Sequence, residues 1–145
     1  MPSEAVNQAT RREWRELGFF YDRDDQAKAW RIIGTAAGLK AFAELVHAYA
    51  SDPKHDALSE HEHFGPYMYL EIGTSSEPEI TDHWIAGPRT ALGALALEIE
   101  RTIPELPIGD AVSLRQVFAS SAAYDLVLER RAEPFDPAEE DKACW

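Results

Sequence analysis

Residues 17–51 read LGFFYDRDDQAKAWRIIGTAAGLKAFAELVHAYAS, and this stretch decides the fold class. Aromatic and β-branched residues lie on both sides of a polar turn at 22–26, which is typical of a β-hairpin. After Gly34, apolar side chains recur at the spacing of one helical face: Leu39, Phe42, Ala43, Val46 and Ala50. Asp52-Pro53 follows them. The pattern therefore predicts a hairpin and then a helix over 35–51.

A similar pattern follows in the second half of the chain. Residues 67–72 alternate with period two, which predicts a strand with Tyr67, Tyr69 and Glu71 on one face and its apolar residues on the other. Residues 80–86 predict another strand, and a helix with apolar positions between 92 and 103 begins after Gly87-Pro88. Five residues of 34–46 match five of 87–99 at an offset of 53. This match indicates either an internal duplication or two amphipathic helices that each follow a hairpin.

Two further strands are expected at 112–118 and 124–131. The resulting order, ββαββαββ, predicts an α+β two-layer sandwich, in which a mostly antiparallel sheet has two helices on one face. Residues 1–145 are expected to form a single domain. Residues 1–14 would be an N-terminal extension that is frayed or forms a short helix, and residues 132–145 a poorly ordered acidic tail.

The charge of the chain restricts its partners. The 145 residues include 26 acidic and 14 basic side chains, for a net charge of −12. Such a field repels phosphates and attracts basic proteins, so we expect no direct nucleic-acid binding. Residues 52–83 hold eight acids and one base, Lys54. This segment is either a solvated acidic surface or a surface for a basic partner.

The same composition predicts a cytoplasmic protein. No apolar run approaches the roughly 20 residues of a membrane span, and residues 1–15 do not resemble a secretion signal. The single cysteine, Cys144, allows neither a disulfide within one chain nor a cysteine metal site. We therefore expect no membrane association and no cofactor.

All five histidines lie between residues 47 and 83, and they suggest one alternative function. In an extended segment, His61 and His63 project to the same side and could hold a zinc or nickel ion together with His55, His83 or a carboxylate. The spacing lacks the His-Glu-x-x-His motif, however. The other interpretation is a polar loop whose histidines cap backbone groups.

Catalysis has little support in the sequence. There is no Gly-x-Ser-x-Gly motif and no glycine-rich phosphate loop, and many carboxylates in an acidic chain do not identify an acid–base pair. A protein-binding surface fits better, because tyrosine and tryptophan provide rigid contact area and nearby acids attract basic side chains. The candidate partner-binding residues are Tyr67, Tyr69, Glu60, Glu62, Glu71, Asp82 and Trp84. The two tyrosines would be the anchors, and the acids would contact Lys or Arg.

Three segments carry a resemblance to a known family: Leu17-Gly18-Phe19-Phe20-Tyr21-Asp22, the segment LSEHEHFGPYMYL at 58–70, and Phe135-Asp136-Pro137-Ala138. Together they resemble small predicted immunity proteins of bacterial polymorphic-toxin systems, over roughly residues 14–140. The resemblance implies an α+β antidote that binds one cognate toxin domain, often a nuclease, and blocks its active site or substrate groove. It supplies no catalytic residues.

The leading hypothesis is therefore a non-enzymatic immunity protein that blocks a basic toxin domain. Two alternatives stay open. One is a metal-dependent enzyme or metal-binding protein that uses His55, His61, His63 and His83. The other is a subunit whose aromatic face makes a homodimer.

Overall fold

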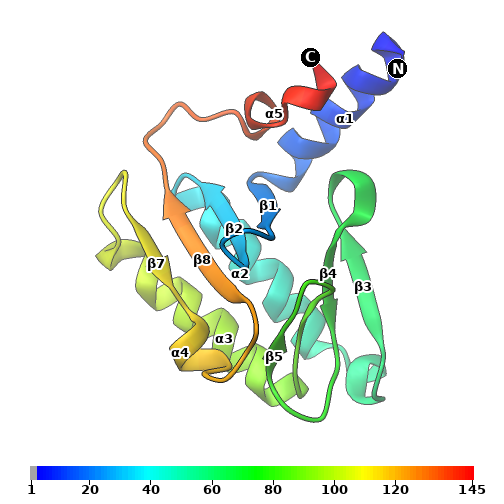
Figure 1. Ribbon diagram of the computed structural model, residues 1–145, viewed down its shortest axis with the longest axis vertical. Coiled ribbons are helices and arrows are strands. Elements are labelled where there is room, and N and C mark those ends of the chain that lie inside the picture. The colour runs from blue at the N-terminus through cyan, green and yellow to red at the C-terminus, as the bar shows by residue number, and fades with distance from the viewer. Residues whose placement is uncertain (1–2) are drawn as a thin grey trace.

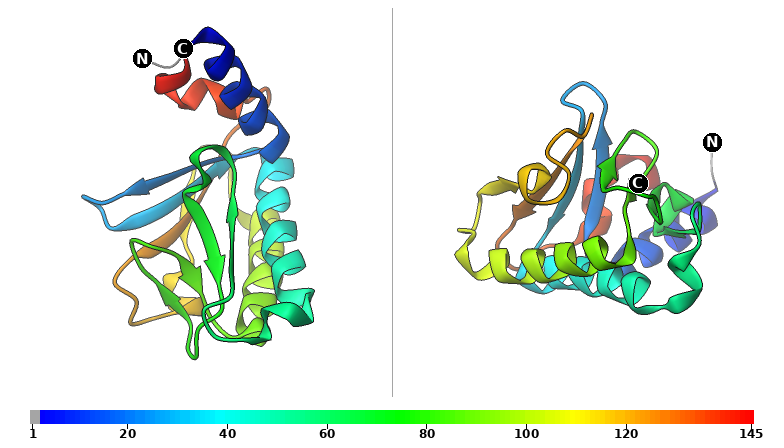
Figure 2. Two further views of the ribbon diagram at one scale, coloured as in Figure 1. Left: turned by 90° about the vertical axis from the view of Figure 1, so that its right-hand side faces the viewer. Right: turned by 90° about the horizontal axis from the view of Figure 1, so that it is seen from below.

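The computed structural model describes residues 3–145, which form a layer of helices covered on one side by β-strands (Figure 2). The long helices α2 (Ala36–Ser51) and α3 (Arg89–Thr102) lie side by side (Figure 1). Apolar side chains from both layers are fully buried between them, among them Phe42, Ile99 and Ile72. The core therefore lies between the helix pair and the strands.

The strands in residues 3–145 form two mixed four-stranded sheets. The first, in the order β1-β2-β8-β7, comprises β1 (Phe20–Asp24), β2 (Ala29–Gly34), β8 (Asp125–Arg130) and β7 (Ala111–Ser113). The second, in the order β3-β4-β6-β5, comprises β3 (His61–Phe64), β4 (Leu70–Gly73), β6 (Ile85–Ala86) and β5 (Glu79–Ile80). In each sheet a parallel pair joins two antiparallel hairpins: β2 pairs with β8, and β4 with β6.

This topology repeats within the chain. Short helices aside, residues 20–73 run hairpin, α2, hairpin, and residues 79–130 run hairpin, α3, hairpin. The second hairpin of each half pairs in parallel with the first hairpin of the other half. The 53-residue offset in the sequence therefore relates equivalent positions, such as Gly34 before α2 and Gly87 before α3.

The start of α2 shows how closely the elements pack. The Thr35 side chain caps the helix by accepting a hydrogen bond from the backbone N–H of Gly38, at 3.2 Å. A Cβ atom at Gly38 would lie 2.5 Å from the carbonyl oxygen of Gly18, which follows helix α1 (Glu4–Leu17). Glycine at position 38 thus lets α2 approach this part of the backbone.

The α+β class and the placement of both long helices on one face of the strands are confirmed. The expected single sheet is instead two sheets, because each hairpin pairs only within its own set of four strands. The segment 80–86 is two short strands, because Thr81 Oγ1 accepts hydrogen bonds from the backbone N–H groups of His83 and Trp84 and closes a turn. The segment 112–118 is likewise divided, into β7 and the one-turn helix α4 (Arg115–Phe118).

The two ends of the described chain pack together. Helix α1 contacts α5 (Pro137–Glu140) and the 3₁₀ turn Lys142–Cys144, and these elements lie at the top of Figure 1. Ala138 and Cys144 are buried there. The expectation of a poorly ordered tail is therefore wrong, because the tail and α1 cover each other's apolar side chains.

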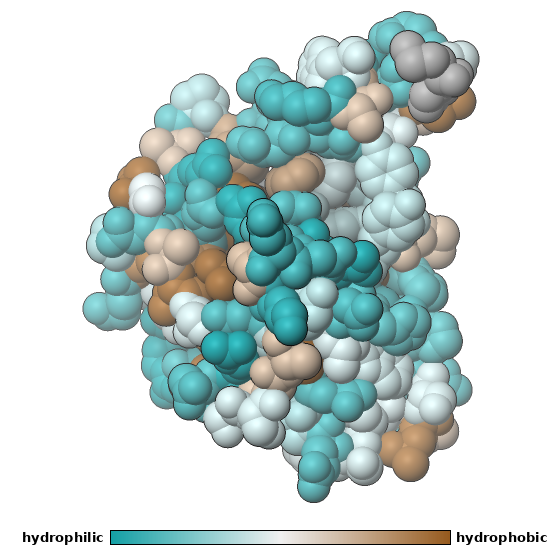
Figure 3. All heavy atoms as spheres, viewed as in Figure 1, coloured by the Kyte–Doolittle hydropathy of each residue, from teal (hydrophilic) through white to brown (hydrophobic). Residues whose placement is uncertain are grey.

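The surface is mostly polar on the face shown in Figure 3, where apolar patches are small and separated by hydrophilic side chains. None of the helices in residues 3–145 has both the length and the apolar character that crossing a membrane requires.

Candidate functional site

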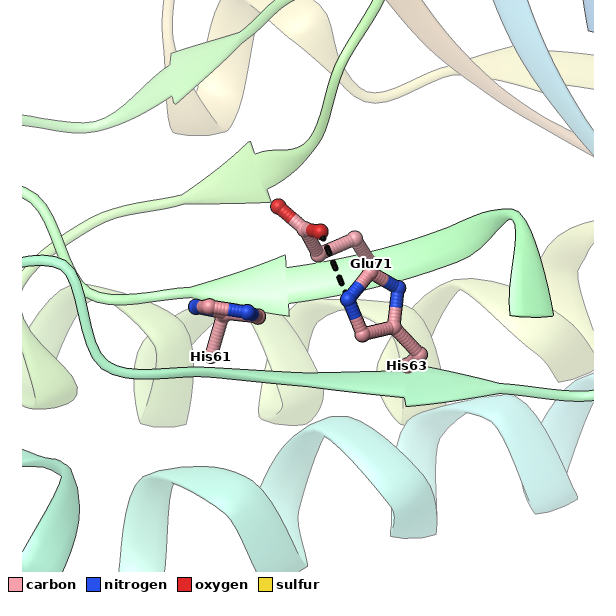
Figure 4. A group of neighbouring side chains, drawn as sticks. All are labelled: His61, His63 and Glu71. Atoms are coloured by element: carbon pink, nitrogen blue, oxygen red, sulfur yellow. Dashed lines mark ion pairs between the residues drawn. The ribbon is translucent and has the colours of Figure 1, made fainter.

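Three histidines lie around a buried glutamate on the outer face of the β3–β4 hairpin, and Figure 4 shows two of them, His61 and His63, with Glu71. His61 and His63 lie two residues apart on β3, and His63 is opposite Glu71 on β4. Glu71 is only 3% exposed. Its Oε1 lies 3.1 Å from His63 Nε2, and its Oε2 lies 2.9 Å from Nε2 of His83 in the β5–β6 turn. We call His61, His63, His83 and Glu71 the histidine cluster.

Backbone carbonyls orient two of these imidazoles. His61 Nδ1 lies 2.9 Å from the carbonyl oxygen of Ser59, and His63 Nδ1 lies 2.9 Å from that of Met68. A carbonyl can only accept a hydrogen bond, so Nδ1 is the donor in both rings. In the neutral imidazoles, Nε2 is therefore the nitrogen with a free lone pair. One potential ligand atom each from His61, His63 and Glu71 lies within 4.8 Å of the other two.

Trp84 covers the hairpin beside the histidine cluster. Its ring lies on Gly73, where a Cβ atom would come 2.2 Å from Trp84 Cε3. The indole N–H donates a hydrogen bond of 2.8 Å to Glu79 Oε1. Trp84, expected as a partner contact, is thus half-buried and packed against strand β4.

His55 does not join the histidine cluster. It is buried, and its ring stacks on Tyr49 with 3.7 Å between the ring centroids. Its Nδ1 lies 2.8 Å from the Tyr49 carbonyl oxygen, and its Nε2 lies 3.0 Å from Glu62 Oε1. Of the four histidines considered for a metal site, His55 therefore lies apart, whereas His61, His63 and His83 lie beside a carboxylate, that of Glu71.

A second candidate site is an aromatic groove of about 570 Å³ between β1 and the segment that precedes β4. We call this cavity the aromatic groove. It is lined by Trp14, Phe20, Tyr21, Asp22, Arg23, Trp30, Tyr67, Tyr69 and Asp141. Tyr67 and Tyr69 are 46% and 70% exposed and stack with 5.7 Å between ring centroids. Large aromatic rings with acidic groups beside them are suited to binding a protein side chain.

The backbone before β4 turns these tyrosines outward. Tyr67 and Met68 have φ angles of 64° and 57°, in the left-handed region that costs free energy for non-glycine residues. The strand predicted from residue 67 therefore begins only at Leu70. As a result, the predicted alternation fails at Met68, which is 59% exposed, whereas Glu71 lies on the predicted outer face and is buried by His63 and His83.

Hydrogen bonds hold the groove in shape. Asp141 Oδ2 accepts from the Tyr67 hydroxyl at 2.6 Å and from Trp14 Nε1 at 2.9 Å. The Tyr21 hydroxyl donates to the Pro66 carbonyl and accepts from the backbone N–H of Tyr69. Burial raises the pKa of Tyr67, and the hydrogen bond to Asp141 raises it further. Burial also raises the pKa of Tyr21 to about 12. Both phenols are thus neutral at physiological pH.

The predicted acidic contacts lie in different places. Glu60 and Asp82 are exposed, whereas Glu62 is half-buried beside His55. Glu71 is covered and does not present its carboxylate to a partner. The structure therefore leaves Glu60 and Asp82 as the accessible acids of the predicted set.

The sequence did not indicate that Trp14 and Asp141 belong to the groove. They lie in segments expected to be an extension and a poorly ordered tail, and 127 positions separate them. Composition could have indicated that the N-terminal segment packs against the rest of the protein, since Trp14 is a large aromatic residue in a polar segment.

The sequence matches no protein-family model, and comparison with curated proteins and with solved structures gives no significant match. A function for this chain must therefore be inferred from its own residues and geometry.

Proposed function

We propose that this protein is a cytoplasmic, non-enzymatic immunity protein that binds a basic bacterial toxin domain and blocks it by occlusion. The observation that carries the proposal is the exposed, stacked pair Tyr67–Tyr69 beside the aromatic groove. The resemblance of residues 14–140 to predicted immunity proteins supports the same function.

The strained backbone at Tyr67 and Met68 favours a role in binding. Two adjacent non-glycine residues, Tyr67 and Met68, adopt positive φ, a conformation that costs on the order of 1 kcal/mol or more for each residue. The fold gains little burial in return, because both side chains are about half exposed. Strain that places aromatic groups at the surface is typical of binding sites.

The groove suits a basic side chain of the partner. An Arg or Lys could lie against the tyrosine rings through a cation–π contact, with Asp141 beside Tyr67 to balance its charge. The net charge of −12 would speed the encounter with a basic protein. A nuclease must attract phosphates, so its substrate surface provides the complementary charge.

The test is to titrate the protein with the purified product of the neighbouring gene, at low and high salt. Wild type should bind tightly, more weakly at high salt, and abolish the toxicity of that product. We expect Tyr69→Ala to weaken binding about 30-fold, or about 2 kcal/mol, as for an interface anchor. Leu97→Ala is the matched control, because Leu97 is 65% exposed on helix α3.

Equal affinities for wild type and Tyr69→Ala, with the fold intact, would exclude the groove. If the protein neither binds the product of the neighbouring gene nor abolishes its toxicity, the immunity function against that product is refuted. Light scattering at several concentrations separates a third outcome, in which the same aromatic face joins two copies of the chain.

A further inference from the structure

We propose that the histidine cluster binds a divalent first-row transition-metal ion, with Zn²⁺ as the ion best suited to its donors. This inference is independent of the proposed immunity function. It rests on the burial of Glu71, on the orientation of the imidazoles and on the chemistry of the four side chains.

Among residues 3–145, the buried carboxylate of Glu71 lacks a hydrogen-bond donor for one of its two oxygens. Within the described residues, its Oε2 is buried and has no hydrogen-bond partner, although His83 Nε2 lies 2.9 Å away. The contact has the distance of an ion pair but lacks hydrogen-bond geometry. A buried carboxylate without a donor costs free energy, and such groups in proteins are usually paired or coordinate a metal.

The imidazole orientations point to a cation between the side chains. In the neutral rings, the Nδ1–H groups of His61 and His63 are used by backbone carbonyls, so each Nε2 lone pair is free. His63 Nε2 then faces Glu71 Oε1 at 3.1 Å, and both atoms are acceptors. Either an additional proton or a metal ion must lie between such groups. Ligating histidines typically donate their other N–H to a carbonyl or carboxylate in this way.

The donor set selects the class of ion. Imidazole nitrogens with one carboxylate oxygen suit Zn²⁺ and its first-row neighbours, whereas Mg²⁺ and Ca²⁺ prefer oxygen ligands alone. Tetrahedral Zn²⁺ at its usual bond lengths places ligand atoms about 3.3 Å apart. The three ligand atoms of His61, His63 and Glu71 are now within 4.8 Å, so small side-chain rotations would close the site. His61 and His83 are exposed, which leaves space for these rotations.

The site is open to solvent on one side, because the side chain of His83 is 70% exposed and that of His63 is 37% exposed. The buried carboxylate fixes the base of the site, and the exposed imidazoles form its rim. Such a geometry allows the ion to enter and leave without unfolding of the hairpin.

The experiment is calorimetric titration of Zn²⁺ into the full chain, purified without an affinity tag and treated with a chelator that is then removed. Wild type should bind one Zn²⁺ per chain. We expect Glu71→Gln to bind at least tenfold more weakly, because it keeps the shape of the side chain and removes its charge. The double variant His61→Gln/His83→Gln should lose binding. The control His47→Gln changes a histidine on α2 outside the histidine cluster and should bind like wild type.

Circular dichroism checks the fold of each variant. If Glu71→Gln fails to fold, the double variant decides the question, since both of its positions are exposed. The proposal is overturned if wild type binds no Zn²⁺ at one per chain, or if the double variant binds as tightly as wild type. It is also overturned if His47→Gln loses as much affinity as the cluster variants. A Tyr69→Ala protein that binds Zn²⁺ normally but not the toxin would show that the two proposals stand or fall separately.

Discussion

Substituting Gly73 by alanine tests how tightly Trp84 covers the second sheet. The new Cβ would lie 2.2 Å from Trp84 Cε3 and 2.3 Å from Cζ3, whereas carbon atoms pack at about 3.5–4.0 Å. The indole ring must therefore move by more than about 1 Å. That movement breaks the hydrogen bond from Trp84 Nε1 to Glu79.

The magnitude follows from three contributions. Overpacking costs about 1–3 kcal/mol, and loss of a hydrogen bond to a charged acceptor adds about 1.5 kcal/mol. The alanine itself should stabilise the protein by about 0.5–1 kcal/mol. It restricts the unfolded chain, and the φ of Gly73 is outside the left-handed region, so alanine can adopt it. We expect the free energy of unfolding to fall by about 3 kcal/mol, and Tm by about 10 °C for a chain of this size.

A double-mutant cycle measured by urea denaturation isolates the cause. In a Trp84→Ala background the clash is absent, so Gly73→Ala should then be neutral or slightly stabilising. Gly93→Ala is the control, because a Cβ there meets only Ala50 Cβ at 3.9 Å, and alanine in the interior of α3 should stabilise the protein by about 0.5–1 kcal/mol. Equal costs of Gly73→Ala in both backgrounds would refute the proposed clash.

Two further predictions concern the packed C-terminal segment. Asp141→Ala removes an acceptor used by two side chains of the aromatic groove, so we expect about 2 kcal/mol less stability in urea denaturation; an unchanged midpoint would show that these hydrogen bonds contribute nothing. The hydrogen bond from Arg15 lowers the pKa of Asp136 from its ordinary 3.8, so the stability it gives is present above that pH and is lost as the pH falls through the lowered value. Asp136→Asn should therefore destabilise the protein near pH 7, with a cost that shrinks as the pH falls below 3.8, and a pH-independent cost would contradict this explanation.

Local periodicity predicted the two long helices well. Apolar spacing placed α2 and α3 to within one or two residues, because each helix buries one continuous face. The short strands were less predictable. Strands β5 and β6 have two residues each, and hydrogen bonds from backbone N–H groups to the Thr81 side chain close the turn between them. Which hairpins share a sheet depends on pairings between distant segments, and no local pattern carries that information.

The candidate site was partly visible in the sequence. Tyr67 and Tyr69 are exposed neighbours, as expected, although their partner contact stays a prediction. Glu71 lies on the outer face of β4, as the alternation predicted, but it is buried because His63 and His83 lie against it. The contact between His83 and Glu71 could not be predicted from spacing, since it requires the β5–β6 hairpin to lie beside β4.

The β5–β6 turn links the two candidate sites through the backbone. The carbonyl of Thr81 accepts a hydrogen bond of 2.7 Å from Trp30 Nε1, and the carbonyl of Asp82 accepts one of 2.6 Å from Arg23. Both donors line the aromatic groove. The next residue, His83, faces the buried carboxylate of the histidine cluster. This short turn therefore positions Trp30 and Arg23 of the aromatic groove as well as His83 of the histidine cluster. Because the Thr81 hydroxyl closes this turn, its removal should disturb both sites, whereas a change to the exposed Asp82 side chain leaves these carbonyl contacts in place.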